Sequence, residues 1–301
     1  MDIHDFSVII PHRGIPHLLQ RCLASIPDTP DVQVIVIDDN SPEDAMDFEH
    51  FPGQERANTM CILDKKGGGA GHARNIGLQH ADGMWLVFAD ADDFFTNDAF
   101  EILKRYKDAP QDIILFKANS VNSDDYSQSD RHLKLNNAID AALSGSMPVK
   151  EAVLAKPVPW CKMLRRDYIQ KNGIRFDETM AANDQMFVAK ATCWANDKAI
   201  AISTEVLYTV TTRTNSLIDN WGKDPSNFLC RLEVQIRYNK FVKSYPFLRK
   251  EPIIFLLANS RRFGMKTFFK AFALVLRKNA LFSGYDTLLK GAKKHLLKFK
   301  Q

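Results

Sequence analysis

The feature that most constrains the fold is an alternation of short apolar runs with segments of helical periodicity over the first third of the chain. The apolar runs have the composition of buried strands and cover Phe6–Pro11, Val32–Asp39, Thr59–Leu63 and Met84–Ala89. Between them, Leu18–Ile26 and Ala73–His80 have the spacing of helices. Strands that alternate with helices predict an α/β fold built on a largely parallel sheet.

Acidic residues follow two of the predicted strands directly. Asp38 and Asp39 end the second strand, and Asp90, Asp92 and Asp93 follow the fourth. In sheets of this kind, ligands bind outside the carboxyl ends of the strands, so both groups of acids fall where a binding crevice is expected. The sequence therefore predicts that these acids serve a ligand.

Asp90 and Asp92 have the spacing of a metal site. Residues two apart in extended backbone point the same way, and two carboxylates on one side suit Mg²⁺ or Mn²⁺ together with substrate phosphate. The alternative interpretation is a solvated acidic loop that caps the next helix, for which Asp93 and Asp98 are candidates. The residues alone leave both interpretations open.

The polar segments after the second and third strands also allow two interpretations. Asp39, followed by Asn40 and Ser41, either accepts hydrogen bonds from a ligand or belongs to a turn. The glycine stretch 67–71 lacks the Gly-Lys-Ser/Thr of a phosphate loop and the third glycine of a dinucleotide fingerprint, so we interpret it as a flexible loop that leads into a helix. Arg74, on that helix, is placed to meet an anion or to pair with an aspartate.

Taken in order, these segments resemble the successive motifs of family 2 glycosyltransferases, which have the GT-A fold. The resemblance is carried by FSVIIPHRG, VIVIDDNSPED, GAGHARNIGLQHADG, LVFADADDFF and VPWCKMLRRDYIQKNGIRFDETMAANDQMF. It extends over about Phe6–Ser216. The resemblance implies an α/β, Rossmann-like nucleotide-sugar-binding domain over residues 1–220, followed by a mostly helical, basic C-terminal region over residues 221–301.

The resemblance also implies roles for residues on the nucleotide side of the site. Pro11 begins the first loop of the nucleotide site, and Asp39 recognises the base, usually uracil. Asp64 adds a further contact near the base, and Asp90 lies near the ribose. Arg74 completes this group as a residue that meets an anion or holds an aspartate in place.

The chemistry that the resemblance implies requires two separate acids. Asp92 is the ligand of the Mn²⁺ or Mg²⁺ ion that holds the diphosphate, where the metal stabilises developing charge. Asp184 is the base that takes the proton of an acceptor hydroxyl in an inverting transfer. The chain departs from the family in having Asn183 where Glu commonly precedes the base, and in having His12-Arg13 where Tyr-Asn is common after the first-loop proline. These departures leave the sugar specificity open.

Three further residues have weaker assignments. The segment Thr211–Leu217 resembles the loop that folds over the donor in relatives, where Arg213 would reach the diphosphate; an ordinary polar loop is the alternative. Trp160 and Lys162 are candidates for the acceptor cleft, with a core position for Trp160 as the alternative.

The C-terminal region is strongly basic. From Arg261 to the end there are eleven Lys and Arg against one acid, Asp286, although the whole chain has a net charge of only +4. At a helical period, Met265, Phe268, Phe269, Phe272, Val275 and Leu276 share one face, and Lys266, Lys270 and Arg277 lie opposite. We expect such a helix either to lie on an anionic membrane surface or to pack on the catalytic domain. No nucleic-acid-binding module accompanies the charge.

Together these patterns predict an inverting, metal-dependent glycosyltransferase. Its donor would be a nucleotide-sugar, most often UDP-linked in this family, and its acceptor a hydroxyl of a saccharide or glycolipid in cell-surface polysaccharide assembly. The alternatives are a nucleotidyltransferase and an inactive relative that binds nucleotide-sugars or membranes. Five scattered cysteines, the lack of a signal peptide and the lack of a long apolar run predict a cytoplasmic protein, peripheral on the inner face of the membrane if the tail binds there.

Overall fold

The computed structural model describes residues 4–213, 224–246, 248 and 250–285. The chain forms two compact units, one of residues 1–179 and 187–213, the other of residues 180–186 and 214–301. The predicted roles of Thr214–Leu217 and of the basic residues after Tyr285 lie outside the described residues.

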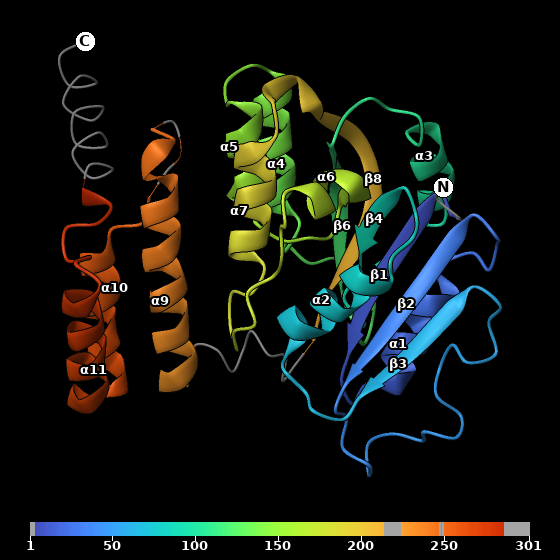
Figure 1. The fold of residues 1–301 in the computed structure, drawn as a ribbon, viewed down its shortest axis with the longest axis horizontal. Coiled ribbons are helices and arrows are strands. Elements are labelled where there is room, and N and C mark those ends of the chain that lie inside the picture. The colour runs from blue at the N-terminus through green and yellow to red at the C-terminus, as the bar shows by residue number, and fades with distance from the viewer. Residues whose placement is uncertain (1–3, 214–223, 247, 249, 286–301) are drawn as a thin grey trace. The chain divides into compact units, whose positions relative to one another are not determined.

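Within the described residues, the first unit contains one mixed sheet with the strand order β3-β2-β1-β4-β7-β6-β8-β5 (Figure 1). The strands are β1 (Phe6–His12), β2 (Val32–Asp39), β3 (Thr59–Asp64), β4 (Trp85–Phe88), β5 (Phe94–Phe95), β6 (Ile113–Asn122), β7 (Lys162–Arg165) and β8 (Ile200–Thr212). The four strands predicted in the first 90 residues are parallel neighbours, whereas β7 and β5 pair antiparallel with their neighbours. β6 and β8 also pair parallel, so the expectation of a largely parallel sheet fails only around β7 and β5.

Helices surround this sheet. They are α1 (Pro16–Ala24), α2 (Ala70–His80), α3 (Ala99–Arg105), α4 (Leu133–Leu143), α5 (Val149–Ala155), α6 (Arg166–Lys171) and α7 (Gln185–Trp194). The connection through α1 runs from β1 to β2, and the connection through α2 runs in the opposite direction across the sheet, from β3 to β4. Because both crossovers are right-handed, the two helices lie on opposite faces of the sheet (Figure 1). The core between the layers is apolar and almost fully buried, as the strand sequences predict.

The polar segment 119–131 is only in part a loop. Residues 119–131 are polar and have the composition of an exposed excursion, yet the first four belong to β6 and pair with β8. The side chain of Ser120 is buried there, and its hydroxyl donates to the main-chain oxygen of Ser129 at 2.8 Å. Hydrogen bonding across the sheet thus compensates for a strand sequence of low apolar content.

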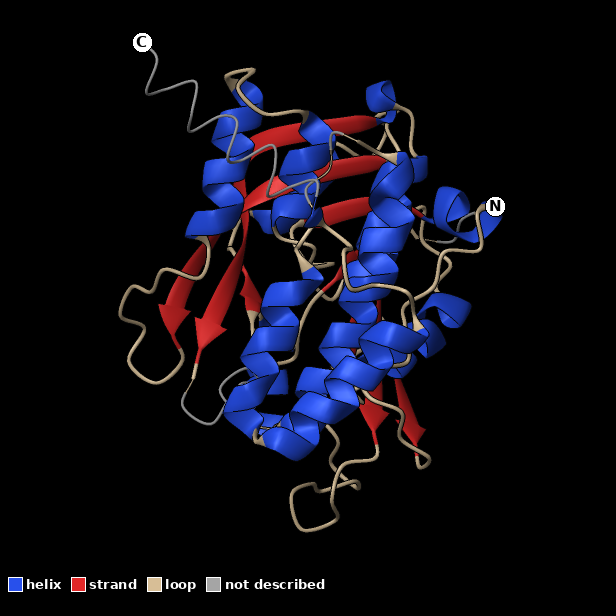
Figure 2. Cartoon of the chain, turned by 90° about the vertical axis from the view of Figure 1, so that its left-hand side faces the viewer, coloured by secondary structure: helices blue, strands red, loops and turns tan. Residues whose placement is uncertain are grey.

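The second unit is helical, as predicted for the C-terminal region. It contains α9 (Pro225–Phe241), α10 (Ile253–Asn259) and α11 (Met265–Arg277), which are drawn among the blue helices of Figure 2. Their apolar side chains form a buried cluster of their own. Pro225 at the start of α9 and the side chain of Asp224, which accepts from the amide of Ser226, give this helix a defined N-terminus.

The apolar face predicted for α11 is divided between buried and exposed residues. Thr267, Ala271 and Val275 are buried, and Phe268 and Leu274 pack against the apolar cluster. Four residues of the predicted face form a stripe of large apolar side chains that stays exposed: Met265, Phe269, Phe272 and Leu276. No helix of the described ranges is both long enough and apolar enough to cross a bilayer.

Candidate active site

The carboxyl ends of β1 and β2 carry a buried hydrogen-bonded group. Nδ1 of His12 lies 2.9 Å from Oδ1 of Asp38, while Nε2 of His12 accepts from the amide of Ile15 at 3.1 Å. The imidazole therefore donates through Nδ1. Ser41 donates to Asp38 through its amide and its hydroxyl. Burial raises the pKa of Asp38, but the hydrogen bonds from His12 and Ser41 outweigh it and hold that pKa below its usual value. The Asp38 carboxylate thus stabilises the turn that follows β2.

Asp39 points instead to the glycine loop. Its carboxylate accepts from the amide of Gly68 at 2.7 Å and from the amide of Gly69 at 2.9 Å. Because a carboxylate offers about four acceptor positions, this contact orders the loop and leaves capacity for a ligand. Asp39 faces Asp64 in the pairing of β2 with β3, and Pro11 lies buried in β1 one strand away. The structure thus brings Asp39 and Asp64 together at one edge.

Asp64 belongs to a charged group that the sequence does not indicate. His72, in the first turn of α2, lies 3.2 Å from Oδ2 of Asp64 through Nε2 and 3.2 Å from Oε2 of Glu178 through Nδ1. Asn75, one turn further, donates to Glu178 and exchanges two hydrogen bonds with the main chain of Phe176. The hydrogen bond from Asn75, with the contact to His72, lowers the pKa of Glu178. The spacing of His72 and Asn75 on one helix face is the only sequence signal for this group.

Asp90 is held between three elements. Its carboxylate accepts from the guanidinium of Arg74 at 2.6 Å, so the two predicted site residues are ion-paired. The Arg74 guanidinium also lies over the ring of Phe176, with 5.4 Å to the ring centroid. The amide of Asp90 donates to the hydroxyl of the buried Tyr208 in β8 at 2.8 Å. Arg74 therefore takes the second of its two predicted roles, that of pairing with an aspartate.

Asp92 and Asp93 have different environments. Oδ2 of Asp92 accepts from Nε of Arg213 at 3.0 Å, and both side chains are one quarter exposed. Asp93 is buried, and its carboxylate accepts from the amide of Thr211 at 2.6 Å. Asp98, at the N-cap position of α3, makes no side-chain capping hydrogen bond. The helix-capping interpretation of the acids therefore does not describe this loop.

The acid group carries more negative charge than its partners neutralise. Burial raises the pKa of Asp92, as does the charge of Asp90, while Arg213 lowers it only in part. Burial and the charges of Asp92 and Asp90 likewise raise the pKa of Asp93. A divalent cation would relieve this repulsion, so the donor set fits Mn²⁺ or Mg²⁺. Among the described residues no three His, Cys, Asp or Glu side chains form a complete metal site, so substrate oxygens would have to supply the other ligands.

Trp160 and Lys162 lie in the core. Trp160 is 3% exposed, and its ring stacks on Tyr208 with centroids 5.7 Å apart. Lys162 is 1% exposed and donates to the main-chain oxygen of Val158 at 2.6 Å. The core alternative for Trp160 thus describes its position, and contact of either residue with an acceptor stays a prediction.

Asp184 belongs to the second unit. It is half-buried in the turn that directly precedes α7, after Ala182, whose φ of 55° is left-handed. The next residue, Gln185, donates through its side chain to Oε1 of Gln235 in α9 at 3.1 Å. The role of Asp184 as a base stays a prediction.

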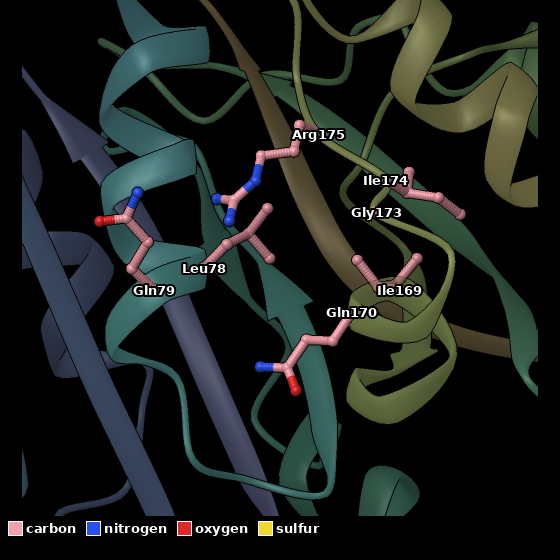
Figure 3. Close-up of a pocket in the computed structure, with 7 residues that line it drawn as sticks. All are labelled: Leu78, Gln79, Ile169, Gln170, Gly173, Ile174 and Arg175. Carbon is pink, nitrogen blue, oxygen red and sulfur yellow. The ribbon is translucent and has the colours of Figure 1, made fainter.

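A separate cavity lies at the other end of α2. It has a volume of about 340 Å³ and is lined by Leu78, Gln79, Ile169, Gln170, Gly173, Ile174 and Arg175 (Figure 3). Leu78 and Gln79 are in the last turns of α2, whereas His72 is in its first turn beside the acids. This cavity is therefore not the predicted site, which is an open edge that carries charged groups.

The sheet order, the crossovers and the acids at the carboxyl edge define a GT-A fold of the glycosyltransferase type. The chain belongs to glycosyl transferase family 2, whose family model matches residues 7–173.

Proteins similar to this chain include an N-acetylglucosaminyltransferase and a polysaccharide biosynthesis protein. The chain is 26% identical over 230 residues to the poly(ribitol-phosphate) beta-N-acetylglucosaminyltransferase TarS of Staphylococcus aureus, covering 74% of this chain and 38% of TarS. It is 35% identical over 109 residues to the succinoglycan biosynthesis protein ExoW of Rhizobium meliloti, covering 33% of this chain and 34% of ExoW. The chain thus spans little more than a third of either relative.

Solved structures share the fold. The crystal structure of residues 1–349 of S. aureus TarS with UDP-GlcNAc superposes with a TM-score of 0.61 and 19% identity, covering 92% of this chain and 83% of that chain. The mannosyltransferase PcManGT of Pyrobaculum calidifontis, in complex with GDP-Man and Mn²⁺, gives a TM-score of 0.54 and 16% identity, covering 97% and 80%. The predicted α/β GT-A fold class is confirmed.

Proposed function

We propose that the protein transfers a sugar from a nucleotide-sugar, most simply a UDP-sugar, to a hydroxyl of a saccharide or lipid-linked acceptor, with inversion at the anomeric carbon. The observation that carries this proposal is the under-neutralised acid group at the end of β4, where the pKa values of Asp92 and Asp93 are raised. Such a group suits a cation and a diphosphate, and the family membership supplies the reaction class.

In the proposed reaction, the acceptor oxygen attacks the anomeric carbon while the bond from that carbon to the diphosphate oxygen breaks. The acceptor proton moves to the carboxylate of Asp184, which is the proposed base. Asp39 and Asp64 would contact the base of the nucleotide, with Pro11 beneath, and Asp90 the ribose. A Mn²⁺ or Mg²⁺ ion on Asp92 would supply charge stabilisation for the departing diphosphate. Arg213, released from Asp92, would then be free to contact a phosphate.

The catalytic domain and the basic region are assigned to successive parts of the chain. Residues 1–220 would form the catalytic domain, and residues 221–301 the helical, basic region. Several named relatives act in the assembly of wall or secreted polysaccharides, so we assign this chain to the same kind of pathway, on the cytoplasmic side of the membrane. A nucleotidyltransferase is the less favoured candidate, because that reaction assigns no chemical role to Asp184.

The activity is tested by incubating the protein with a panel of nucleotide-sugars, with and without Mn²⁺, and measuring both free nucleotide and thermal stabilisation. We expect one UDP-sugar to raise the melting temperature and to release UDP only with the metal. A ligand at a hundred times its Kd stabilises by about 2.7 kcal/mol, which is easily measured. Stabilisation without any release, for the whole panel and for added acceptors, would instead support the inactive relative.

We also propose that the exposed stripe of α11 contacts an anionic membrane surface. Phe269 is 61% exposed and Met265 57% exposed. Lys266 and Lys270 are also exposed, and each lies about 100° around the helix from the apolar residue before it, so the lysines border the stripe on one side. Apolar side chains flanked by lysines match the boundary between lipid headgroups and acyl chains.

Exchanging both Met265 and Phe269 for serine should release the protein from anionic vesicles at low salt. Burial of one such side chain contributes about 1.5–3 kcal/mol, so we expect binding to weaken at least tenfold. Leu143→Ser is the matched control, because Leu143 is 50% exposed on α4 of the first unit. A wild-type protein that ignores the vesicles, or a double variant that binds them equally well, would contradict the membrane proposal.

A further inference from the structure

The second unit contains a cavity of about 260 Å³ that has no role in the proposed reaction. Its floor is apolar and buried, formed by Phe228 and Leu232 of α9. The rim is polar, and the residues that line it are Gln185, Arg231, Gln235, Glu251, Asn259 and Arg262, together with Leu256. A cavity with two guanidiniums and three amides at its rim has the chemistry of an anion-binding site.

The two arginines are available to a ligand. Among the described residues, neither Arg231 nor Arg262 forms an ion pair with a carboxylate, although Glu251 lines the same cavity. The guanidinium of Arg262 lies over the ring of Phe263, with 4.6 Å to the centroid, which limits its motion. Two guanidiniums and one carboxylate give the rim a net charge of about +1, which matches a phosphodiester or a singly charged phosphomonoester.

Two of the three amides that line the cavity are held in place. Gln185 donates to Gln235 at 3.1 Å, and Gln235 donates in turn to Oδ1 of Asn239 at 3.0 Å. Asn239 is buried and exchanges hydrogen bonds with the main chain of Glu251, at 2.6 Å and 3.2 Å. This chain of hydrogen bonds fixes one side of the cavity without the arginines, so a ligand would meet a preformed site.

The position of the cavity in the chain points to the acceptor. Asp184, the proposed base, directly precedes Gln185, and the base must lie beside the acceptor hydroxyl. The donor is a poor occupant, since small-molecule sites usually measure about 300–1,000 Å³, and this cavity is smaller than that range. It has room for a phosphate and part of the alcohol esterified to it.

We propose that this cavity binds a phosphate group of the acceptor, held by Arg231 and Arg262, so that the acceptor is a phosphate-bearing polyol or saccharide rather than a neutral sugar. The proposal rests on the proposed transferase function, because the cavity is assigned to the acceptor through Gln185, which lines the cavity and directly follows the proposed base, Asp184. It adds that the acceptor must carry a negative charge, which membership of glycosyl transferase family 2 does not imply.

Calorimetric titration with glycerol 3-phosphate, and with glycerol as its neutral counterpart, tests the proposal. We expect the wild type to bind glycerol 3-phosphate but not glycerol. Arg231→Gln and Arg262→Gln should each weaken the affinity roughly 10–100-fold, the usual contribution of a charge-assisted hydrogen bond. Arg261→Gln is the matched control, since Arg261 lies over Phe268 and does not line the cavity. It should bind as the wild type does.

Two further measurements distinguish an acceptor phosphate from the phosphates of the donor and of lipid headgroups. UDP affinity with Mn²⁺ should be the same in both glutamine variants, and a loss there would assign the arginines to the donor and overturn the proposal. Vesicles of phosphatidylglycerol should bind both variants as they bind the wild type, and selective loss of vesicle binding would assign the arginines to lipid headgroups.

Equal glycerol 3-phosphate affinity in the wild type and both variants, or none in the wild type, would also overturn the proposal. This titration needs no donor. A protein that fails to transfer sugar but binds glycerol 3-phosphate through Arg231 would therefore refute the transferase and leave the anion site standing.

Discussion

Sugar transfer is expected to fall by roughly 10²–10⁴-fold when Asp184 is replaced by asparagine, the usual contribution of a general base. Asparagine keeps the size and much of the hydrogen bonding of the side chain but cannot accept the acceptor proton at neutral pH. Asp184 has no assigned contact with the diphosphate, so the affinity for the donor with Mn²⁺ should be nearly unchanged. The measurement is kcat alongside donor affinity, and a collapse of kcat alone is the expected pattern.

The neighbouring acids provide the controls. Asp177→Asn should transfer sugar nearly as the wild type does. Glu178→Gln should have a smaller effect than Asp184→Asn, because Glu178 already accepts from Asn75. The melting temperature of each variant must match the wild type for the comparison to hold. Near wild-type transfer by Asp184→Asn, with the true acceptor supplied, would remove Asp184 as the base and leave Asp177 or Glu178 as the candidates.

Turnover should fall by roughly 10³-fold or more when Asp92 is replaced by asparagine, because a metal on a leaving diphosphate supplies several kcal/mol of charge stabilisation. The variant should fold, since the Asp92 side chain is one quarter exposed and asparagine can still accept from Arg213. Asp98→Asn is a suitable control, because that acid makes no side-chain capping hydrogen bond at the start of α3. Substantial turnover by Asp92→Asn in the presence of Mn²⁺ would remove Asp92 from the reaction.

Local patterns in the sequence were sufficient to predict the edge that carries the acids. Each parallel strand of the first half is a short apolar run, and the acids stand within a few residues of the strand ends, so their common edge follows from the α/β alternation. The pairing of Arg74 with an aspartate was also predictable, because Arg74 is on the helix that leads into the strand before Asp90.

Contacts between distant segments were not predictable in this way. Arg213 reaches Asp92 across 121 residues, and Tyr208 accepts from the amide of Asp90 across 118. Asn75 holds the main chain of Phe176 across 101 residues. The contacts of Arg213 and Tyr208 depend on the order of β7, β6 and β8, which the polar composition of residues 119–131 obscures. The apolar face predicted for α11 is only in part exposed for a similar reason, because periodicity alone does not say that Phe268 and Val275 are covered by the neighbouring helices.

The claim that the acids at the end of β4 hold a cation between protein and diphosphate is tested most directly by one titration. UDP affinity is measured by calorimetry with and without Mn²⁺, for the wild type and for Asp92→Asn. We expect Mn²⁺ to tighten UDP binding to the wild type and to have no effect on the variant, whose affinity stays at the metal-free level. Equal tightening by Mn²⁺ in both proteins, or wild-type UDP binding that does not respond to Mn²⁺, would contradict it.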